Sequence, residues 1–134
     1  MEKRIYCDPV IGLLHHLKAK SGTVHDVHGI AHITGGGLSN LLRLHDSLGW
    51  HIDSPMPIPP EFVWLQQSGN VTDLEMHRTF NMGLGMVLAV SKDACEDVLN
   101  FLAAKNSGAQ IIGHVHDAGH NVTHVNSQVV FQHY

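Results

Sequence analysis

Apolar residues recur at helical spacing close to the start of the chain. Asp8 and Pro9 precede this pattern, and both are typical of a helix start. The Asp8 side chain can accept from unpaired amide groups, and Pro9 lacks the amide hydrogen that would go unpaired in a first turn. Ser21-Gly22 is typical of a helix end. We therefore expect a helix from Asp8 to Ser21, with an apolar face formed by Val10, Leu13, Leu14 and Leu17.

Several later segments also show helical spacing. A leucine stripe begins at Leu38 and is closed by Gly49, and Thr72 with Glu75 forms a capping box, in which each side chain can pair with the other residue's amide. Ser91 is a candidate cap for another helix. The expected helices are Leu38–Gly49, Phe62–Gly69, Thr72–Arg78 and Ser91 to about Lys105, the last with Val98, Leu99 and Leu102 on its inner face.

Short apolar runs between these helices predict strands. Ser54–Pro60 holds four prolines in seven residues and predicts a stiff surface loop. The alternation of helices and strands predicts one mixed α/β (α+β) domain over residues 1–134, with a small sheet of about four to five strands covered by helices. The expected strands are Gly29–Ile33, Trp50–Asp53, Leu84–Val90, Gln110–Val115 and Gln128–Phe131.

Composition and charge narrow the class of protein. Apolar residues make up 43% of the chain and charged residues 15%, which is typical of a globular domain. The net charge of −4 and the scattered Lys and Arg argue against a nucleic-acid partner and a membrane surface. Met1–Tyr6 leads into no signal-peptide core, so we expect a cytoplasmic protein. Cys7 and Cys95 are far apart in sequence, which favours two reduced thiols over a disulfide.

The strongest candidate for chemistry is the segment from His32 to Asn40. A buried strand is expected to lead into Thr34, Gly35, Gly36 and Gly37 and then into a helix, an arrangement typical of anion binding. Ser39 and Asn40 could add side-chain donors. A tight turn alone would need only one glycine, so three favour the anion site. The segment is neither GxGxxG nor a P-loop, and it does not by itself name a ligand.

A second candidate begins at Glu75 and ends at Met86. Arg78 and Asn81 come just before an apolar strand, and Arg78 could clamp a phosphate with two hydrogen bonds. Gly83 and Gly85 would let a ligand or another backbone approach closely. An alternative is equally compatible with the spacing: Arg78 pairs with Glu75 or Asp73, and Asn81 satisfies a turn.

Histidine is unusually frequent, at 13 of 134 residues. The pairs His114/His116 and His120/His124 invite comparison with zinc ligands, but no HExxH motif or matching Cys or carboxylate accompanies them. We therefore predict no metal site in this chain. No catalytic triad or ATP-binding set of Lys and carboxylates is present either, so the catalytic residues are not identified and the sequence reads as part of a site.

At its two glycine-containing motifs the chain resembles the aminoimidazole ribonucleotide synthetases (phosphoribosylformylglycinamidine cyclo-ligases), specifically their C-terminal domain. The resemblance runs in order from Arg4 to about Val115. Its most specific parts are the AHITGGG segment at Ala31–Gly37 and the RTFNMGLGM segment at Arg78–Met86. The remaining matching residues are Arg4–Tyr6, Pro9-Val10, Gly29-Ile30, Asn40, Trp64–Gln66, Gly69–Val71, Glu75-Met76 and Ile111–Gly113.

The resemblance implies an activity in purine biosynthesis. Enzymes of this family use ATP and Mg to activate the amide oxygen of formylglycinamidine ribonucleotide, and a neighbouring amine then closes the imidazole ring. An N-terminal domain holds most contacts to ATP and Mg and forms the homodimer. That domain is absent from this sequence, so the resemblance implies that it is supplied in cis or as a split subunit and that this chain alone is inactive.

The resemblance also implies roles for particular residues. Thr34, Gly35, Gly36, Gly37, Ser39 and Asn40 would hold an anionic group of the substrate, with Arg78 and Asn81 close by and His32 orienting the loop. The family commonly has a Glu-Asn pair where this chain has Ser39-Asn40, so a role for that Glu does not transfer.

Two other functions are compatible with the sequence. The chain could be a stand-alone nucleotide- or phosphate-binding module, or the C-terminal domain of a related ATP-dependent enzyme such as a hydrogenase maturation factor.

Overall fold

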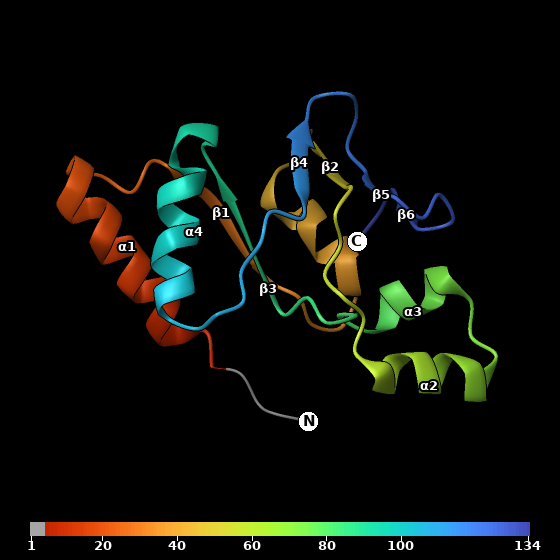
Figure 1. The fold of residues 1–134 in the computed structure, drawn as a ribbon. Helices are drawn as coiled ribbons and strands as arrows, with labels where there is room; N and C mark the ends of the chain where they lie inside the picture. The colour runs from red at the N-terminus through yellow and green to blue at the C-terminus, as the bar shows by residue number, and fades with distance from the viewer. Residues whose placement is uncertain (1–4) are drawn as a thin grey trace. The chain divides into compact units, whose positions relative to one another are not determined.

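The structure is a computed structural model that describes residues 5–134, so Arg4 of the family resemblance lies outside it. The chain divides into two compact units. The first unit comprises the residues up to Ile30 together with Leu88–Gln110, and the second comprises Ala31–Val87 together with Ile111–Tyr134. The chain passes from one unit to the other within β1 (Val27–His32) and again within β3 (Met86–Val90), which pair as a two-stranded sheet (Figure 1).

The first unit is built around two helices. They are α1 (Cys7–Ser21) and α4 (Cys95–Ala104), the latter preceded by the short 3₁₀ helix η2 (Lys92–Ala94). Their facing sides form one hydrophobic core, in which Leu13 is fully buried. The other buried members of this core are Leu17, Ala94, Val98 and Leu102.

The predicted first helix is confirmed, but its start differs in detail. It begins at Cys7, with Tyr6 at the cap position and no side-chain cap, so Asp8 lies in the first turn instead of capping it. A carboxylate there still stabilises the helix, because the N-terminal end carries partial positive charge. The end is as predicted: Gly22 adopts φ +76° and donates its amide hydrogen to the Lys18 carbonyl at 2.8 Å.

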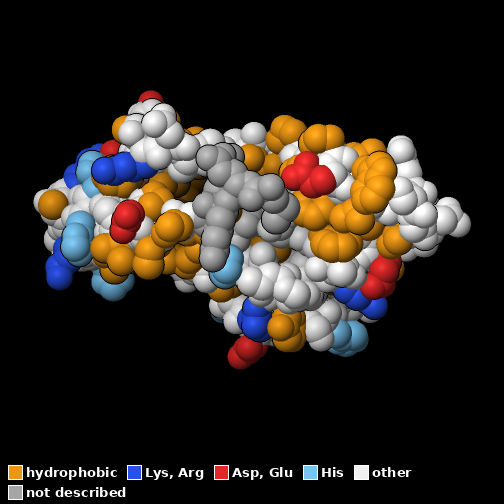
Figure 2. All heavy atoms as spheres, turned by 90° about the horizontal axis from the view of Figure 1, so that it is seen from below, with side chains coloured by type: hydrophobic (Ala, Val, Ile, Leu, Met, Phe, Trp, Pro, Cys, Tyr) orange, Lys and Arg blue, Asp and Glu red, His pale blue; other side chains and the backbone are white. Residues whose placement is uncertain are grey.

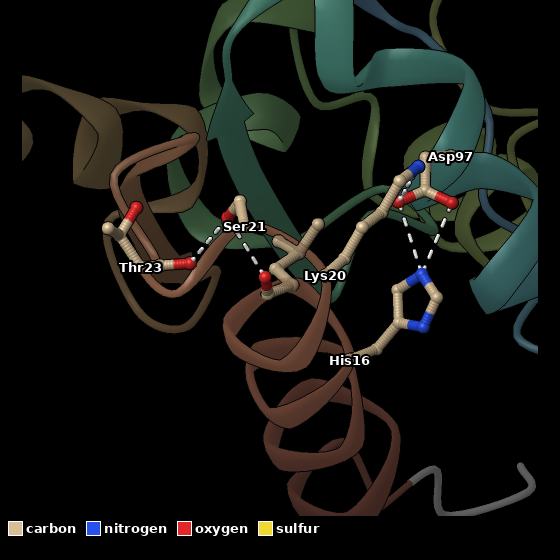
Figure 3. A network of polar contacts seen from close by, with 6 residues as sticks. His16, Lys20, Ser21, Thr23 and Asp97 are labelled. Carbon is tan, nitrogen blue, oxygen red and sulfur yellow. Dashed lines mark hydrogen bonds and ion pairs between the residues drawn. The ribbon is translucent and has the colours of Figure 1, made fainter.

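A polar cluster joins the two helices of the first unit (Figure 3). The Asp97 carboxylate lies 3.1 Å from Nε2 of His16 and 3.2 Å from Nζ of Lys20. These hydrogen bonds, first from His16 and then from Lys20, lower the pKa of Asp97 below its ordinary value. The His16 ring also stacks on Phe101, with ring centroids 4.9 Å apart. All these groups are partly exposed, so the cluster adds little to stability.

The second unit holds a four-stranded sheet in the order β4-β2-β5-β6. β2 (Gly49–Ile52) is antiparallel to β4 (Gly113–His116) and parallel to β5 (Val122–His124), and β6 (Val130–Phe131) is antiparallel to β5. The 3₁₀ helix η1 (Gly37–Leu44) contacts β2 and β5. The buried side chains of this unit include Leu38, Leu41, Trp50, Ile52, Val122 and Phe131.

Two further helices of the second unit follow the proline-rich loop. They are α2 (Pro60–Gly69) and α3 (Asp73–Thr79). Thr72 caps α3 as predicted, since its Oγ1 accepts from the Glu75 amide at 3.3 Å. The Glu75 carboxylate does not complete the box in this structure, because it accepts instead from the Thr79 hydroxyl at 3.1 Å.

The mixed α/β class is confirmed, with corrections to several elements. The strands divide between two sheets, and β5 was not predicted. The helix after the glycine loop is 3₁₀ and ends at Leu44, not at Gly49, and Ser91 makes no side-chain cap. The strand expected over Gly29–Ile33 corresponds to β1, whose residues alternate between more and less exposed positions and are not all buried. Within residues 5–134 no helix is long and apolar enough to cross a membrane.

Truncating Leu13 is expected to destabilise the chain strongly. Leu13 is fully buried between α1 and α4, so Leu13→Ala should lower the free energy of unfolding by about 2–5 kcal/mol through lost burial and a residual cavity. Ile11 on the same helix is 48% exposed, so Ile11→Ala should change it by about 0.5 kcal/mol or less. Urea denaturation followed by circular dichroism measures both, and equal losses would contradict this packing.

Candidate functional site

The three-glycine loop leads from β1 into η1. Gly36 and Gly37 adopt left-handed backbone conformations, with φ +98° and +54°, which favour glycine over residues with a side chain. The Gly37 amide donates to the Thr34 carbonyl at 2.9 Å and closes the turn. Two of the three glycines are therefore required by the backbone, and the turn uses more than the single glycine of an ordinary strand-to-helix connection.

Gly37 brings the two sequence motifs together. It is buried, and a Cβ at this position would overlap the carbonyl group of His77 and lie 3.0 Å from the carbonyl oxygen of Phe80. A second link lies four residues earlier in the chain, where the Ile33 amide donates to the Gly85 carbonyl at 2.9 Å. The glycine loop and the segment after α3 thus pack backbone to backbone, as the glycines of both motifs permit.

Asn40 holds the loop in shape from inside. Its side-chain amide donates to the carbonyls of Gly37 at 2.7 Å, Gly35 at 3.2 Å and Thr34 at 3.4 Å. Ser39 similarly donates its hydroxyl to the Gly36 carbonyl at 2.7 Å. Both side chains are buried, and in this structure their donors are occupied by the loop itself. Their contribution here is to bond the loop carbonyls, and these bonds leave the loop amides unused.

Sequence reasoning missed Arg43 and Tyr134. The Arg43 guanidinium donates to Oδ1 of Asn40, which orients that amide with its nitrogen toward the loop. It also lies over the Tyr134 ring, 4.3 Å from the ring centroid, and the same ring flanks Gly36. Arg43 follows Asn40 by three residues, a spacing that places side chains on one helix face and could have revealed the pair. Nothing in the sequence pattern indicated Tyr134.

The mouth of the loop is open to solvent. Thr34 and Gly35 are exposed, and a Cβ on Gly35 would meet nothing within 4 Å. In the described part of the chain, no hydrogen bond uses the amide of Gly35 or Gly36 as its donor. Two unpaired amides at the start of a helix attract an anion through hydrogen bonding and the partial charge of the helix end.

Arg78 lies exposed in the last turn of α3. Across residues 5–134 it forms no ion pair with Asp73 or Glu75, contrary to the alternative considered from its spacing. The Asp73 carboxylate accepts from Gln66 at 2.6 Å and Asn126 at 2.8 Å, and these two bonds lower the pKa of Asp73. The Arg78 guanidinium lies 5.8 Å from the centroid of the Phe131 ring. Its charge is therefore available to a ligand.

Asn81 takes a structural position. Its Oδ1 accepts from the Gly83 amide at 3.0 Å, and its carbonyl accepts from the Leu84 amide at 2.8 Å, so it satisfies a turn as the alternative proposed. Gly83 adopts φ +90°, and a Cβ there would meet Pro59 at 2.8 Å and the Pro57 carbonyl at 2.9 Å. The predicted close approach at Gly83 is thus made by another backbone segment. The ligand-binding role of Asn81 stays a prediction.

Two histidines of the second unit, His77 and His124, lie side by side. His77 is buried and its Nδ1 donates to the Asp73 carbonyl at 2.8 Å. Its ring lies 5.0 Å from that of His124, whose Nδ1 accepts from the Asn126 amide at 2.9 Å. Burial, and then the proximity of His77 and His51, lower the pKa of His124. His32, the predicted orienting residue, is exposed at the end of β1.

The other histidines make separate contacts. His114 lies 3.3 Å from the Asp53 carboxylate, His51 lies 2.7 Å from the Thr123 hydroxyl, and His120 lies 3.0 Å from the Leu42 carbonyl. Among the described residues, no group of three or more His, Cys, Asp or Glu side chains is placed to hold a metal ion. Cys7 and Cys95 are free thiols.

Residues 10–126 match the family model described as AIR synthase related protein, C-terminal domain. A phosphoribosylformylglycinamidine cyclo-ligase from Methanopyrus kandleri is 41% identical over 127 residues, which cover 95% of this chain and 34% of that protein. A protein of the same name from Methanococcus vannielii is 41% identical and covers 85% of this chain and 30% of its own length. One from Burkholderia mallei is 44% identical, and the match covers 81% of this chain and 29% of that protein.

A solved structure titled as a HypE-HypF complex contains a chain with a similar fold. The TM-score is 0.60 at 19% identity, covering 90% of this chain and 39% of that one. At this identity the likeness concerns the fold alone. The chain spans about a third of the length of the curated relatives it matches.

Adding a methyl group at Gly37 should disrupt the site. Gly37→Ala places a Cβ against the His77 carbonyl in a left-handed conformation, so the free energy of unfolding should fall by about 2 kcal/mol or more. Gly35→Ala is the matched control, because its Cβ would point into open space, and it should unfold at nearly the wild-type temperature. Differential scanning calorimetry compares them, and an unchanged Gly37→Ala would show that the two motifs do not pack as described.

Acidification should destabilise the second unit partly through His124. Because its folded-state pKa lies below the ordinary value of 6.5, the unfolded chain binds a proton there more readily, and stability falls as the pH drops through that range. His124→Gln should reduce the loss of unfolding free energy between about pH 7.5 and about pH 5.5. His25, which is exposed, provides the control variant His25→Gln. If the unfolding free energies of wild type and His124→Gln depend on pH in the same way, His124 does not contribute to the acid destabilisation.

Proposed function

Because the chain belongs to the AIR synthase related protein family, as its C-terminal domain, we propose that it is the C-terminal domain of a phosphoribosylformylglycinamidine cyclo-ligase. Three curated relatives of 41–44% identity carry this name. Since the chain spans only about a third of their length, the proposed activity needs the remaining part of such a protein, joined to this chain or supplied as a split subunit. The chain alone is then inactive.

The proposed reaction is the ATP-dependent closure of an imidazole ring. The amide oxygen of formylglycinamidine ribonucleotide takes the terminal phosphoryl group of ATP, and ADP leaves. The neighbouring amine nitrogen then attacks the activated carbon, and phosphate leaves with the oxygen, which yields aminoimidazole ribonucleotide. ATP and Mg are held mostly by the N-terminal domain, which also forms the homodimer, and the protein acts in the cytoplasm.

The open amides of Gly35 and Gly36 are the observation that supports this role most directly. They suit an anionic group of the nucleotide substrate, and Arg78 adds an unpaired positive charge from the second motif. Gly37 positions the loop against α3, while Asn40 and Ser39 hold its carbonyls inward. In this proposal Asn40 and Ser39 act by shaping the loop, and Thr34 lies at its exposed mouth.

Two other functions make different predictions. The fold likeness to a chain of the HypE-HypF complex supports a related ATP-dependent enzyme as a second candidate, which would not use formylglycinamidine ribonucleotide. A stand-alone nucleotide- or phosphate-binding module would bind its ligand without any second domain. The three candidate functions are distinguished by whether the chain, mixed with an N-terminal half, uses formylglycinamidine ribonucleotide.

The test is ADP release from ATP in the presence of Mg and formylglycinamidine ribonucleotide. The purified chain is assayed alone and together with the complementary part of the Methanopyrus kandleri relative, produced as a separate protein. Release only in the mixture supports the proposed function. No release in either assay contradicts it and favours a different ligand.

A carboxylate at the mouth of the loop should weaken substrate binding. Gly35→Asp leaves the packing intact, because its side chain would enter open space, but it places a negative charge where the substrate anion is proposed to bind. In the active mixture we expect kcat/KM to fall about tenfold or more, equivalent to about 1.4 kcal/mol. Gly35→Ala should retain nearly full activity. Equal activity of the Asp and Ala variants would refute the anion site.

A further inference from the structure

Helix α2 buries little of its own surface for an apolar helix. It is ten residues long, and of these only Phe62 is buried. Val63 is 39% exposed, Trp64 66% and Leu65 39%, and Ile58 just before the helix is 43% exposed. These four side chains are termed the α2 surface below. A helix that is apolar on several sides normally lies within a larger assembly or protein core.

The helix is nevertheless held firmly in the second unit. Phe62 packs with Met76, Met82 and Phe80, and its ring centroid lies 5.4 Å from that of Phe80. Gln66 donates to the Asp73 carboxylate at 2.6 Å, which ties α2 to α3. The α2 surface is therefore a preformed platform, so binding to it requires little ordering of the helix itself.

Trp64 points away from these anchors. It follows Phe62 by two residues, which turns its side chain by about 200° around the helix axis. Within residues 5–134 its side chain makes no hydrogen bond or ring contact. Figure 2 shows hydrophobic side chains gathered on the face seen from below, where α2 lies. Trp64 belongs to the Trp64–Gln66 segment of the family resemblance, which takes no part in the proposed site.

The chemistry of the α2 surface favours a folded protein as its partner. Glu61 is the only charged residue of α2, so the surface offers no charge pattern for a nucleic acid, an anionic membrane or an acidic peptide. Exposed tryptophan with few neighbouring charges is typical of the centre of a protein interface.

The length of the curated relatives indicates which protein is the partner of the α2 surface. The matched segment covers 34% of the Methanopyrus kandleri protein, so about two thirds of such a protein is available to cover this chain. A ten-residue helix is about 15 Å long and alone presents less than the roughly 800 Å² per partner of a standard interface. A larger partner that reaches beyond α2 satisfies this requirement better than the same small helix of a second copy.

We propose that the α2 surface docks the remaining part of the cyclo-ligase, its N-terminal region, with Trp64 as the central anchor. The inference rests on the proposed function for the identity of the partner. It extends that function by naming where the second part of the active protein is held.

The test uses the 134-residue chain, tagged and co-expressed with the complementary region of the Methanopyrus kandleri relative. Trp64→Glu should weaken the complex about thirtyfold or more, the size typical of a hot-spot residue. Val125 is 61% exposed in the same unit and lies outside the α2 surface, so Val125→Glu should change affinity by about twofold or less. Co-purification and surface plasmon resonance measure the complex, and circular dichroism checks that each variant is folded.

The outcomes separate this inference from the proposed function. A complex lost only in Trp64→Glu supports the α2 surface as the docking site. The inference is overturned if both variants bind equally tightly, or if the wild-type chain forms no complex. It is also overturned if Trp64→Glu abolishes self-association of the chain and leaves the complex intact. A wild-type complex that releases no ADP but is lost in Trp64→Glu contradicts the proposed function and leaves the docking site supported. An active mixture unaffected by Trp64→Glu contradicts the docking site alone.

Discussion

The close packing of Gly37 against the end of α3 is the contact on which the candidate site depends. Only a residue without a side chain can lie against the carbonyls of His77 and Phe80, and it does so with φ +54°. This contact places the three-glycine loop beside the segment that carries Arg78. The Ile33–Gly85 hydrogen bond fixes the same arrangement from the strand side. The contact at Gly37 therefore brings together two motifs that lie more than forty residues apart in sequence. Gly83 of the second motif has a different role, because it makes room for Pro57 and Pro59.

Once Gly37 is placed, polar groups determine what the loop presents. Asn40 pulls the carbonyls of Thr34, Gly35 and Gly37 inward, and Arg43 orients the Asn40 amide. With the carbonyls bonded in this way, the amides of Gly35 and Gly36 remain without an acceptor among the described residues. In the proposed function these two amides bind the ligand, and the buried Asn40 acts on binding only by shaping the loop.

Local patterns predicted the helices and the main strands because apolar spacing and end signals are properties of a single segment. The helix ending at Gly22 and the Thr72 cap are examples. β5 was not predicted because three residues are too few to show an alternation of apolar and polar positions. It is a strand because it pairs in parallel with β2. The glycine loop was identified from its composition, but the roles of Arg43 and Tyr134 depend on packing that sequence does not encode locally. The turn at Asn81, in which its Oδ1 accepts from the Gly83 amide, was one of two interpretations that the spacing allowed, and the ligand-binding role of Asn81 stays a prediction.

In the proposed function, the glycine loop presents its free amides to an anionic nucleotide. The most direct measurement is a ¹H–¹⁵N correlation spectrum of the labelled chain titrated with formylglycinamidine ribonucleotide. Saturable shifts are expected for the Gly35 and Gly36 amide signals, with no shift of the Gly22 amide, which caps α1 in the first unit. Shifts spread over both units, or no shift at Gly35 and Gly36 at saturating ligand, would contradict it.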